Sequence, residues 1–266
     1  MSDQSPDDSA VPTTDGSPRP PAGRTAAVVP AAGKGIRLGP GTPKALRELG
    51  GTPMLVHAVR ALARSRSVTL VVVVAPPDAT EAVRTMLDGF PLPGATELTV
   101  VAGGATRQES VHRGLRALPA DVDVVLVHDA ARPLVPVDTV DAVVAAVRAG
   151  APAVVPALPL ADTVKEIAAD PDRPAGAPEP VVATPERARL RAVQTPQGFD
   201  RATLTEAHER ITGEGEGATD CAGMVERLGR QVVLVPGHEE AFKVTRPLDL
   251  VLAEAVLARR RATDGF

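Results

Sequence analysis

A glycine-rich segment with basic residues follows the first apolar stretch of the chain. Residues 30–39 read PAAGKGIRLG, and Lys44 comes shortly after them. Glycines let backbone N–H groups approach a phosphate closely, and Arg37 and Lys44 would add positive charge, although the glycines alone would equally suit a tight turn. The segment is not a Walker A loop, because Lys34 is followed by Gly35 rather than by Ser or Thr. A dinucleotide-binding fingerprint is also excluded, because the third glycine is displaced and prolines block a helix.

An aspartate follows another apolar stretch, in the sequence HDAARP at residues 128–133. Ligands of open α/β sheets bind at the carboxyl ends of parallel strands, where Asp129 would lie. Next to a phosphate loop, such a carboxylate is suited to Mg²⁺, which is usually bound by one or two carboxylates together with phosphate oxygens. Alternatively, Asp129 caps a following helix or pairs with Arg132. His128 is expected to pack in the interior rather than to catalyse.

Other polar segments occur at the ends of predicted elements. Residues 103–110, GGATRQES, offer polar contacts for a base, or simply a helix N-cap near Thr106. Hydroxyls and cations that would suit a second, phosphorylated and hydroxyl-rich substrate recur in residues 162–165, 187, 194–197, 218–220 and 242–245. No Ser-His-Asp set and no Cys/His cluster stands out by spacing, which disfavours covalent and zinc chemistry.

The composition excludes several classes of protein. The chain has 266 residues, of which 44% are hydrophobic and 23% charged, enough apolar material for a sizeable core. A net charge of -4 with scattered basic residues argues against a nucleic-acid partner, and no apolar run approaches the roughly 20 residues of a membrane span. Without Trp or Tyr, a base must be recognised by backbone and polar groups. The single cysteine and the acidic, polar N-terminus predict a cytoplasmic protein.

Short apolar runs alternate with amphipathic stretches from Thr25 onward, which is typical of an α/β protein. Strands are expected at residues 26–29, 70–75, 98–101, 124–127, 153–155 and 232–235, several of them apolar on both faces as in a buried parallel sheet. Helical spacing of apolar residues appears near residues 55–62, 111–118, 140–147 and 250–257. We therefore predict a Rossmann-like, mostly parallel sheet with helices on both faces.

Two segments are expected to lie outside this core. Residues 1–24 contain almost no large apolar side chain and are predicted to be a disordered tail, which leaves residues 25–266 as a single domain. Residues 168–185 are rich in proline and too irregular for a core element. Because their flanks could be extended, we predict a projecting β-hairpin arm inserted at about residues 160–192.

These motifs together resemble the 2-C-methyl-D-erythritol 4-phosphate cytidylyltransferase family. The resemblance rests on residues 30–35, 43–44, 127–133, 194–197 and 242–250, and it spans about residues 25–259. It implies a nucleotidyltransferase fold of the glycosyltransferase-A-like kind, with the arm used to form a homodimer. The implied reaction transfers CMP from CTP to 2-C-methyl-D-erythritol 4-phosphate, giving 4-CDP-2-C-methyl-D-erythritol and pyrophosphate, in the non-mevalonate isoprenoid precursor pathway.

The resemblance also implies roles for individual residues. Arg37 and Lys44 match the basic pair that stabilises the pentacoordinate α-phosphate, and Asp129 matches the acid associated with Mg²⁺. Arg187, reaching across the dimer from the arm, and Lys243 match further catalytic residues that hold the methylerythritol phosphate. The substrate-binding positions are Ala31, Ala32, Gly33, Gly104, Ala105, Ser110, Arg132, Thr163, Thr195 and Thr219.

Two alternatives remain open from the sequence. A cytidylyltransferase acting on ribitol 5-phosphate or another polyol phosphate would share the phosphate loop and the HDAARP segment. A non-catalytic nucleotide-binding domain is a remote alternative, because binding alone would not need all of these cations together with the carboxylate. The chain departs from the family at Ala45, where members often have Gln, and at Ala105, where some have Asp.

Overall fold

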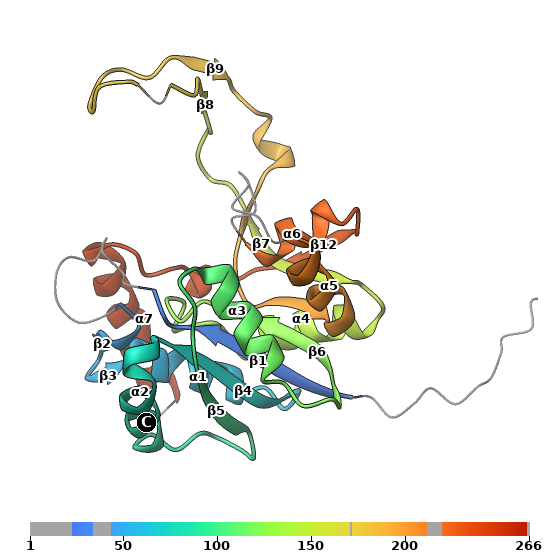
Figure 1. The fold of residues 1–266 in the computed structure, drawn as a ribbon. Coiled ribbons are helices and arrows are strands. Elements are labelled where there is room, and N and C mark those ends of the chain that lie inside the picture. The colour runs from blue at the N-terminus through green and yellow to red at the C-terminus, as the bar shows by residue number, and fades with distance from the viewer. Residues whose placement is uncertain (1–22, 34–43, 171, 212–219, 265–266) are drawn as a thin grey trace, which may run out of the picture.

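An eight-stranded sheet forms the centre of the protein (Figure 1). The computed structural model describes residues 23–33, 44–170, 172–211 and 220–264. The six strands that have parallel partners are β1 (Arg24–Pro30), β4 (Val68–Ala75), β5 (Glu97–Ala102), β6 (Val122–Val127), β7 (Ala153–Pro159) and β12 (Val232–Pro236). They coincide with the six strands expected from the sequence, so the predicted, mostly parallel α/β sheet is confirmed.

One antiparallel strand, β11 (Gln197–Asp200), separates β6 from β7. The short strand β10 (Arg191–Val193) precedes β11 in the chain and also pairs antiparallel with β7. Residues 194–196 therefore lie at the junction of two strands that pair with β7. The sequence pattern does not predict β11, because Phe199 is its only large apolar residue.

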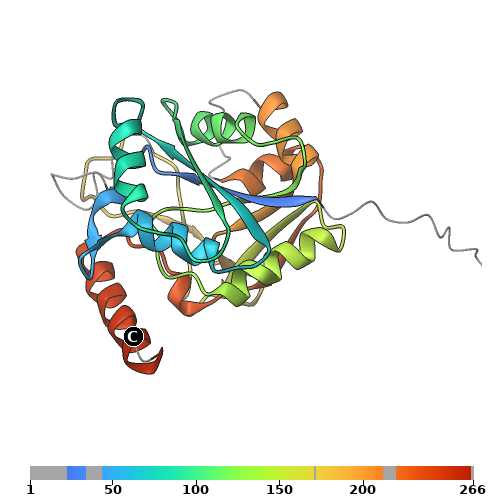
Figure 2. The ribbon, with the colours of Figure 1, turned by 90° about the horizontal axis from the view of Figure 1, so that it is seen from below.

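Helices cover both faces of the sheet, which gives the protein two apolar cores (Figure 2). Along β1, Ala27 and Val29 pack on one face while Ala26 and Val28 pack on the other, and all four are fully buried. The first face is covered by α1 (Met54–Ala63), α2 (Thr80–Asp88) and α4 (Val137–Arg148), and the second by α3 (Arg107–Arg116), α5 (Arg201–Arg210) and α6 (Cys221–Arg227). Burial on both faces explains why these strands are continuously apolar.

The C-terminal helix α7 (Pro247–Asp264) packs at one side of this core, beside the small hairpin of β2 (Glu48–Leu49) and β3 (Thr52–Pro53). Its contacts form a third apolar cluster, which includes Leu49, Met54, Leu134, Val244 and Ala253. This helix confirms the one predicted near residues 250–257. Among the described residues, no helix is both long and apolar enough to cross a membrane.

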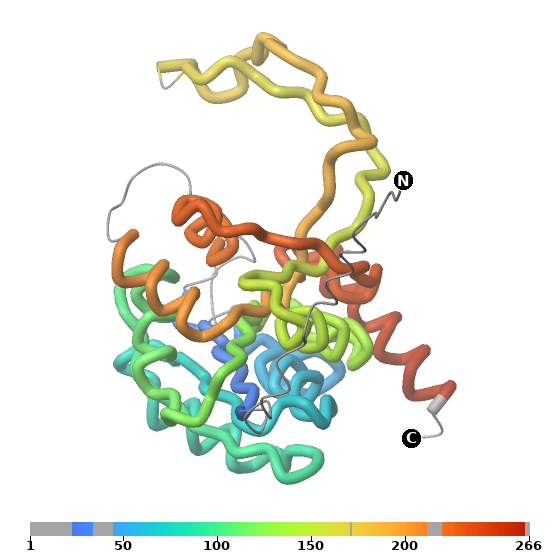
Figure 3. The backbone as a smooth tube through the Cα atoms, turned by 90° about the vertical axis from the view of Figure 1, so that its right-hand side faces the viewer, coloured from blue at the N-terminus to red at the C-terminus, as the bar shows by residue number. Residues whose placement is uncertain are grey.

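The inserted segment between β7 and β10 projects far from the body of the protein (Figure 3). Near its far end, β8 (Glu166–Ile167) pairs antiparallel with β9 (Val181–Ala183). This is the hairpin arm that the sequence predicts at about residues 160–192. Its valines and isoleucine have no core to enter, and Ile167, Val181 and Val182 are exposed by 42%, 55% and 59%.

The domain begins slightly earlier than the sequence analysis predicts. Residues 1–22 of the predicted tail lie outside the described residues, but Gly23 and Arg24 belong to the folded domain. The backbone N–H of Gly23 donates to Asp123 over 2.9 Å, and Arg24 starts β1 and forms an ion pair with Glu97 over 2.8 Å. The folded domain therefore extends two residues before the predicted start at residue 25, because Arg24 has the polar character of the tail yet is the first residue of β1.

Candidate active site

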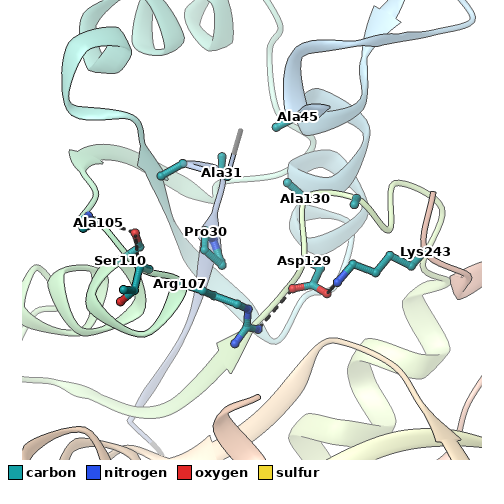
Figure 4. A pocket seen from close by; sticks show the side chains of 14 residues that line it. Pro30, Ala31, Ala45, Ala105, Arg107, Ser110, Asp129, Ala130 and Lys243 are labelled. Atoms are coloured by element: carbon teal, nitrogen blue, oxygen red, sulfur yellow. Dashed lines mark hydrogen bonds and ion pairs between the residues drawn. The ribbon is translucent and has the colours of Figure 1, made fainter. Parts of the chain in front are cut away.

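A cavity of about 220 Å³ opens at the carboxyl ends of the parallel strands (Figure 4). Four chain segments surround it: the loops after β1, β5 and β6, and the loop that leads into α7. This is the position at which open α/β sheets bind ligands. Its walls are formed by Pro30, Ala31, Ala32, Gly33, Ala45, Gly104, Ala105, Thr106, Arg107, Ser110, Asp129, Ala130, Ala131 and Lys243.

Short side chains and backbone groups shape the side of the cavity next to β5. The backbone N–H of Ala31 donates to Val74, and that of Gly103 donates to Ala75, so both loops continue the sheet for one more hydrogen bond. A Cβ atom at Gly104 would collide with the side chain of Glu109. A larger residue at this position would have to displace the half-exposed Glu109 side chain, whereas glycine leaves the backbone groups of the loop near the cavity.

Ser110 and Thr106 hold this loop in shape. The hydroxyl of Ser110 accepts the N–H of Gly104 over 3.1 Å and donates to the carbonyl of Thr106 over 2.9 Å. Thr106 is the N-cap of α3, because its hydroxyl accepts the N–H of Glu109. The N-cap interpretation of this segment is thus confirmed, and the same loop also forms a wall of the cavity.

Asp129 lies between two cations. One carboxylate oxygen is 2.7 Å from Lys243 Nζ, the other is 3.3 Å from Arg107 Nη2, and the Asp129 side chain is only 13% exposed. Figure 4 shows the two basic side chains approaching the carboxylate from opposite sides. Burial alone would raise the pKa of Asp129, but the charges of Arg107 and Lys243 outweigh it and hold that pKa well below its usual range. The group is therefore a fixed anion at the cavity wall.

The structure excludes the two alternatives for Asp129. The next helix, α4, begins at Val137 with Pro136 as its N-cap, so Asp129 does not cap it. The ion pairs of Asp129 are with Arg107 and Lys243 rather than with Arg132. The guanidinium of Arg132 instead donates to the backbone carbonyls of Ala241 and Val193, over 2.6 and 3.3 Å.

Arg107 is the charged residue lining this cavity that the sequence analysis did not include among the site residues. It is the first residue of α3, and its side chain reaches both Asp129 and the thiol of Cys221, at 3.7 Å. The sequence carries one signal for it, since Arg107 lies in the glycine-rich GGATRQES segment. Helix periodicity gives no indication that its side chain reaches Asp129, just after β6.

Twelve of the fifteen predicted site residues fall into three groups. Those that line the one cavity are Ala31, Ala32, Gly33, Gly104, Ala105, Ser110, Asp129 and Lys243. Arg132 and Thr195 lie behind the wall that carries Asp129, and the Thr195 hydroxyl accepts the Asp129 N–H over 3.0 Å. Thr163 and Arg187 lie on the exposed arm and do not line the cavity in the same chain.

Three predicted basic or hydroxyl residues are wholly or partly outside the described structure. Arg37 and Thr219 lie outside the described residues. For Lys44 the backbone is described, as the first residue of the short 3-10 helix η2 (Lys44–Leu46). Its neighbour Ala45 lines the cavity, which brings the backbone of Lys44 to the same wall.

His128 is buried, as the sequence analysis expects, and its environment has a consequence for stability. Burial lowers the pKa of His128 to about 4, and burial together with the nearby charges of His112 and Arg107 lowers that of His208 to about 4. Each histidine titrates near 6.5 when the chain is unfolded, so between these values the unfolded state binds more protons. Acidification through this window therefore favours unfolding.

We expect the free energy of unfolding to fall between about pH 7 and about pH 5.5, by up to about 1.4 kcal/mol per pH unit for each histidine. Urea denaturation followed by circular dichroism would measure it, because the chain has no Trp or Tyr to report by fluorescence. His208→Gln should reduce the pH dependence by about half. A free energy of unfolding that stays constant over this range would contradict the expectation.

Comparisons with known proteins show which family the sequence of this chain is similar to. The family model described as IspD, 2-C-methyl-D-erythritol 4-phosphate cytidylyltransferase, matches residues 25–259. The protein of that name from Streptomyces avermitilis is 71% identical over 252 residues, covering 95% of this chain and 99% of that protein. The one from Rhodococcus jostii is 49% identical over 235 residues, covering 88% of this chain and 96% of that protein.

Solved structures agree in fold. The crystal structure of 2-C-methyl-D-erythritol 4-phosphate cytidylyltransferase from Thermus thermophilus superposes with a TM-score of 0.67 at 38% identity, covering 88% of this chain and 99% of that one. The crystal structure of 4-diphosphocytidyl-2C-methyl-D-erythritol synthase from Anaerococcus prevotii has a TM-score of 0.74 at 27% identity, covering 90% of this chain and 100% of that one.

Proposed function

Because the chain belongs to the 2-C-methyl-D-erythritol 4-phosphate cytidylyltransferase family, we propose how its own residues carry out the reaction of that family. The reaction transfers CMP from CTP to 2-C-methyl-D-erythritol 4-phosphate and releases pyrophosphate, a step of the non-mevalonate pathway. The observation that carries the proposal is the position of Asp129 between Arg107 and Lys243, in the wall of a cavity lined by backbone-rich loops.

We place CTP in this cavity. No aromatic side chain is among the described residues that line it, so the cytosine would be recognised by the backbone and small side chains of the loops after β1 and β5. The triphosphate would extend toward the positive charges of Lys243 and, as the family resemblance implies, of Arg37 and Lys44. This orientation brings the α-phosphate to the wall that carries Asp129.

The chemistry needs charge stabilisation rather than proton removal. The nucleophile is an oxygen of a phosphate monoester, whose second pKa is about 6, so it is already anionic near neutral pH and no general base is required. Negative charge accumulates on the equatorial oxygens of the transferring phosphate. Fixed cations in a partly buried site stabilise that charge at no cost of reorganisation. Lys243 is held for this role by its ion pair with Asp129.

We propose Mg²⁺, or another divalent cation, as the cofactor, with Asp129 as its protein ligand. The described residues contain no group of three or more His, Cys, Asp or Glu side chains able to hold a metal alone, whereas Asp129 presents one carboxylate to the cavity. One carboxylate combined with substrate phosphate oxygens is a common way for proteins to bind Mg²⁺. When bound, the ion would neutralise phosphate charge.

For the second substrate we propose a hollow that shares Lys243 with the cavity. It is lined by Phe242, Lys243, Thr245, Arg246, Asp249 and Leu252. Lys243 thus belongs to both surfaces, as a residue that brings two phosphates together must. Thr163 and Arg187 lie on the arm, so we propose that they complete the site of a second copy of the chain.

We propose a homodimer formed through the arm. Apolar side chains exposed on a projecting hairpin indicate a surface that a partner covers. Double replacement of Val181 and Val182 by Asp is expected to give a monomer, measured by light scattering during gel filtration. Because the arm also carries Arg187, the monomer should lose most of its turnover. A Glu179→Gln variant alters one exposed arm residue without adding charge and should remain dimeric; a double variant that also stays dimeric would contradict the proposal.

Pyrophosphate release tests the proposed function directly. We expect release from CTP and Mg²⁺ when 2-C-methyl-D-erythritol 4-phosphate is added, and little when ribitol 5-phosphate replaces it. Preference for ribitol 5-phosphate would keep the roles of Asp129 and Lys243 but overturn the acceptor. No release with either acceptor would overturn the enzymatic assignment. We also propose that the protein is cytoplasmic, which suits its one buried, free cysteine, Cys221.

A further inference from the structure

His128 is hydrogen-bonded on both ring nitrogens although it does not line the cavity. Its Nδ1 is 3.0 Å from the hydroxyl of Thr195, and its Nε2 is 3.1 Å from the backbone carbonyl of Arg132. The same Thr195 hydroxyl accepts the backbone N–H of Asp129 over 3.0 Å. His128 is fully buried and Thr195 is 5% exposed, so water does not compete for these bonds. A continuous chain of hydrogen bonds therefore leads from the protein interior to Asp129.

The partners fix the direction of each bond. The Arg132 carbonyl can only accept, so Nε2 of His128 carries the proton and, in the neutral ring, Nδ1 is an acceptor. The Thr195 hydroxyl then donates its single proton to Nδ1 and directs its lone pairs at the Asp129 N–H. Without the imidazole as acceptor, the hydroxyl proton has no fixed direction, and the lone pairs of Thr195 are no longer held toward the Asp129 N–H.

We propose that His128 is a positioning residue for nucleotidyl transfer, which acts through Thr195 to fix the backbone of Asp129 and so aims its carboxylate into the cavity. The inference rests on the proposed function. His128 and Asp129 directly follow β6, and they differ in position, since His128 is fully buried in the interior whereas Asp129 lines the cavity. His128 is also anchored by its own N–H, which donates to Val28 of β1 over 3.0 Å. The imidazole therefore stands on a rigid part of the sheet.

Amide replacements separate the two ring nitrogens. His128→Asn places an amide oxygen near the position of Nδ1 and can still accept from Thr195, whereas His128→Gln reaches toward Arg132 and leaves Thr195 without its acceptor. Thr195→Val removes the hydroxyl and keeps the shape of the side chain. The readouts are kcat and KM from pyrophosphate release, CTP binding by calorimetry, and the thermal denaturation midpoint.

We expect His128→Gln and Thr195→Val each to lower kcat by about 10- to 100-fold, with the KM for CTP changed by less than about threefold. His128→Asn should keep kcat within about fivefold of the unaltered enzyme. The double variant with His128→Gln and Thr195→Val should be no slower than Thr195→Val alone, because both changes break the same chain.

Multiplying losses in the double variant would overturn the proposal, since His128 would then act independently of Thr195. If His128→Gln does not fold, the His128→Asn variant still tests the proposal. A folded His128→Asn variant whose kcat falls more than about tenfold would overturn the proposal. Failure of the unaltered enzyme to release pyrophosphate would overturn the proposed function instead. The two failures are therefore distinguishable.

Discussion

Replacing Asp129 by asparagine is expected to lower kcat at least 100-fold while the protein stays folded. Asp129 is the only carboxylate among the described residues that line the cavity, and it lies within 3.3 Å of Arg107 and within 2.7 Å of Lys243. Asparagine has nearly the same volume as aspartate but no charge. It therefore attracts Arg107, Lys243 and a divalent ion less strongly than the carboxylate does. Loss of one preorganised charge at such a site typically costs about 100- to 1,000-fold.

The measurement is pyrophosphate release at saturating concentrations of both substrates. Asp141→Asn is the matched control, since it makes the same change on α4, where Asp141 accepts a hydrogen bond from Ser65 at the opposite edge of the sheet. That variant should turn over normally. Turnover of Asp129→Asn within about threefold of the control would show that the carboxylate has no part in the reaction.

Alanine at Arg37 or at Lys44 should each reduce kcat by about 100- to 1,000-fold as well. The family resemblance assigns this basic pair to the α-phosphate, where negative charge grows in the transition state. For Lys44 the structure adds that the next residue, Ala45, lines the cavity. Binding of CTP, measured by calorimetry, should be weakened much less than turnover, because the charge to be stabilised is larger in the transition state than in bound CTP.

Arg66→Ala provides a matched control for these two variants. Arg66 is an exposed residue in the turn between α1 and β4, at the end of the sheet away from the cavity. Its loss removes one positive charge from the same protein and should leave kcat unchanged. Near-normal turnover in Arg37→Ala or in Lys44→Ala would remove that residue from the catalytic assignment.

The parts of the fold that the sequence predicts most directly are the strands buried on both faces. β4 contains an unbroken apolar run from Leu70 to Ala75, which no exposed element would show. β11 is different, because QGFD has no periodic pattern and becomes a strand only through its pairing with β6 and β7. In the same way, α2 buries only Val83 and Leu87, too little for its period to stand out.

The candidate site also has parts that the sequence predicts and parts that it does not. Its loops are predictable because glycines or an aspartate follow directly after apolar strands, and the carboxyl ends of those strands meet at one edge. The partner of Asp129 is not predictable, because Arg107 is a helical residue whose side chain crosses to a different strand. For Arg132 and Thr195 the motifs predict contact with substrate. In the structure the side chains of both residues instead form hydrogen bonds with backbone groups behind the cavity wall.

The loop that carries Lys243 ties the charge pair to the assembly of the whole sheet. Asp129 and Lys243 are 114 positions apart in the sequence, yet the N–H of Val244 donates to Ala131 over 2.8 Å and so joins the two segments. Bringing together residues so far apart costs loop-closure entropy, which the packing of β7, β11 and β12 between them must offset. The charge pair therefore forms only in a chain whose sheet is complete, so turnover also reports that folding is complete.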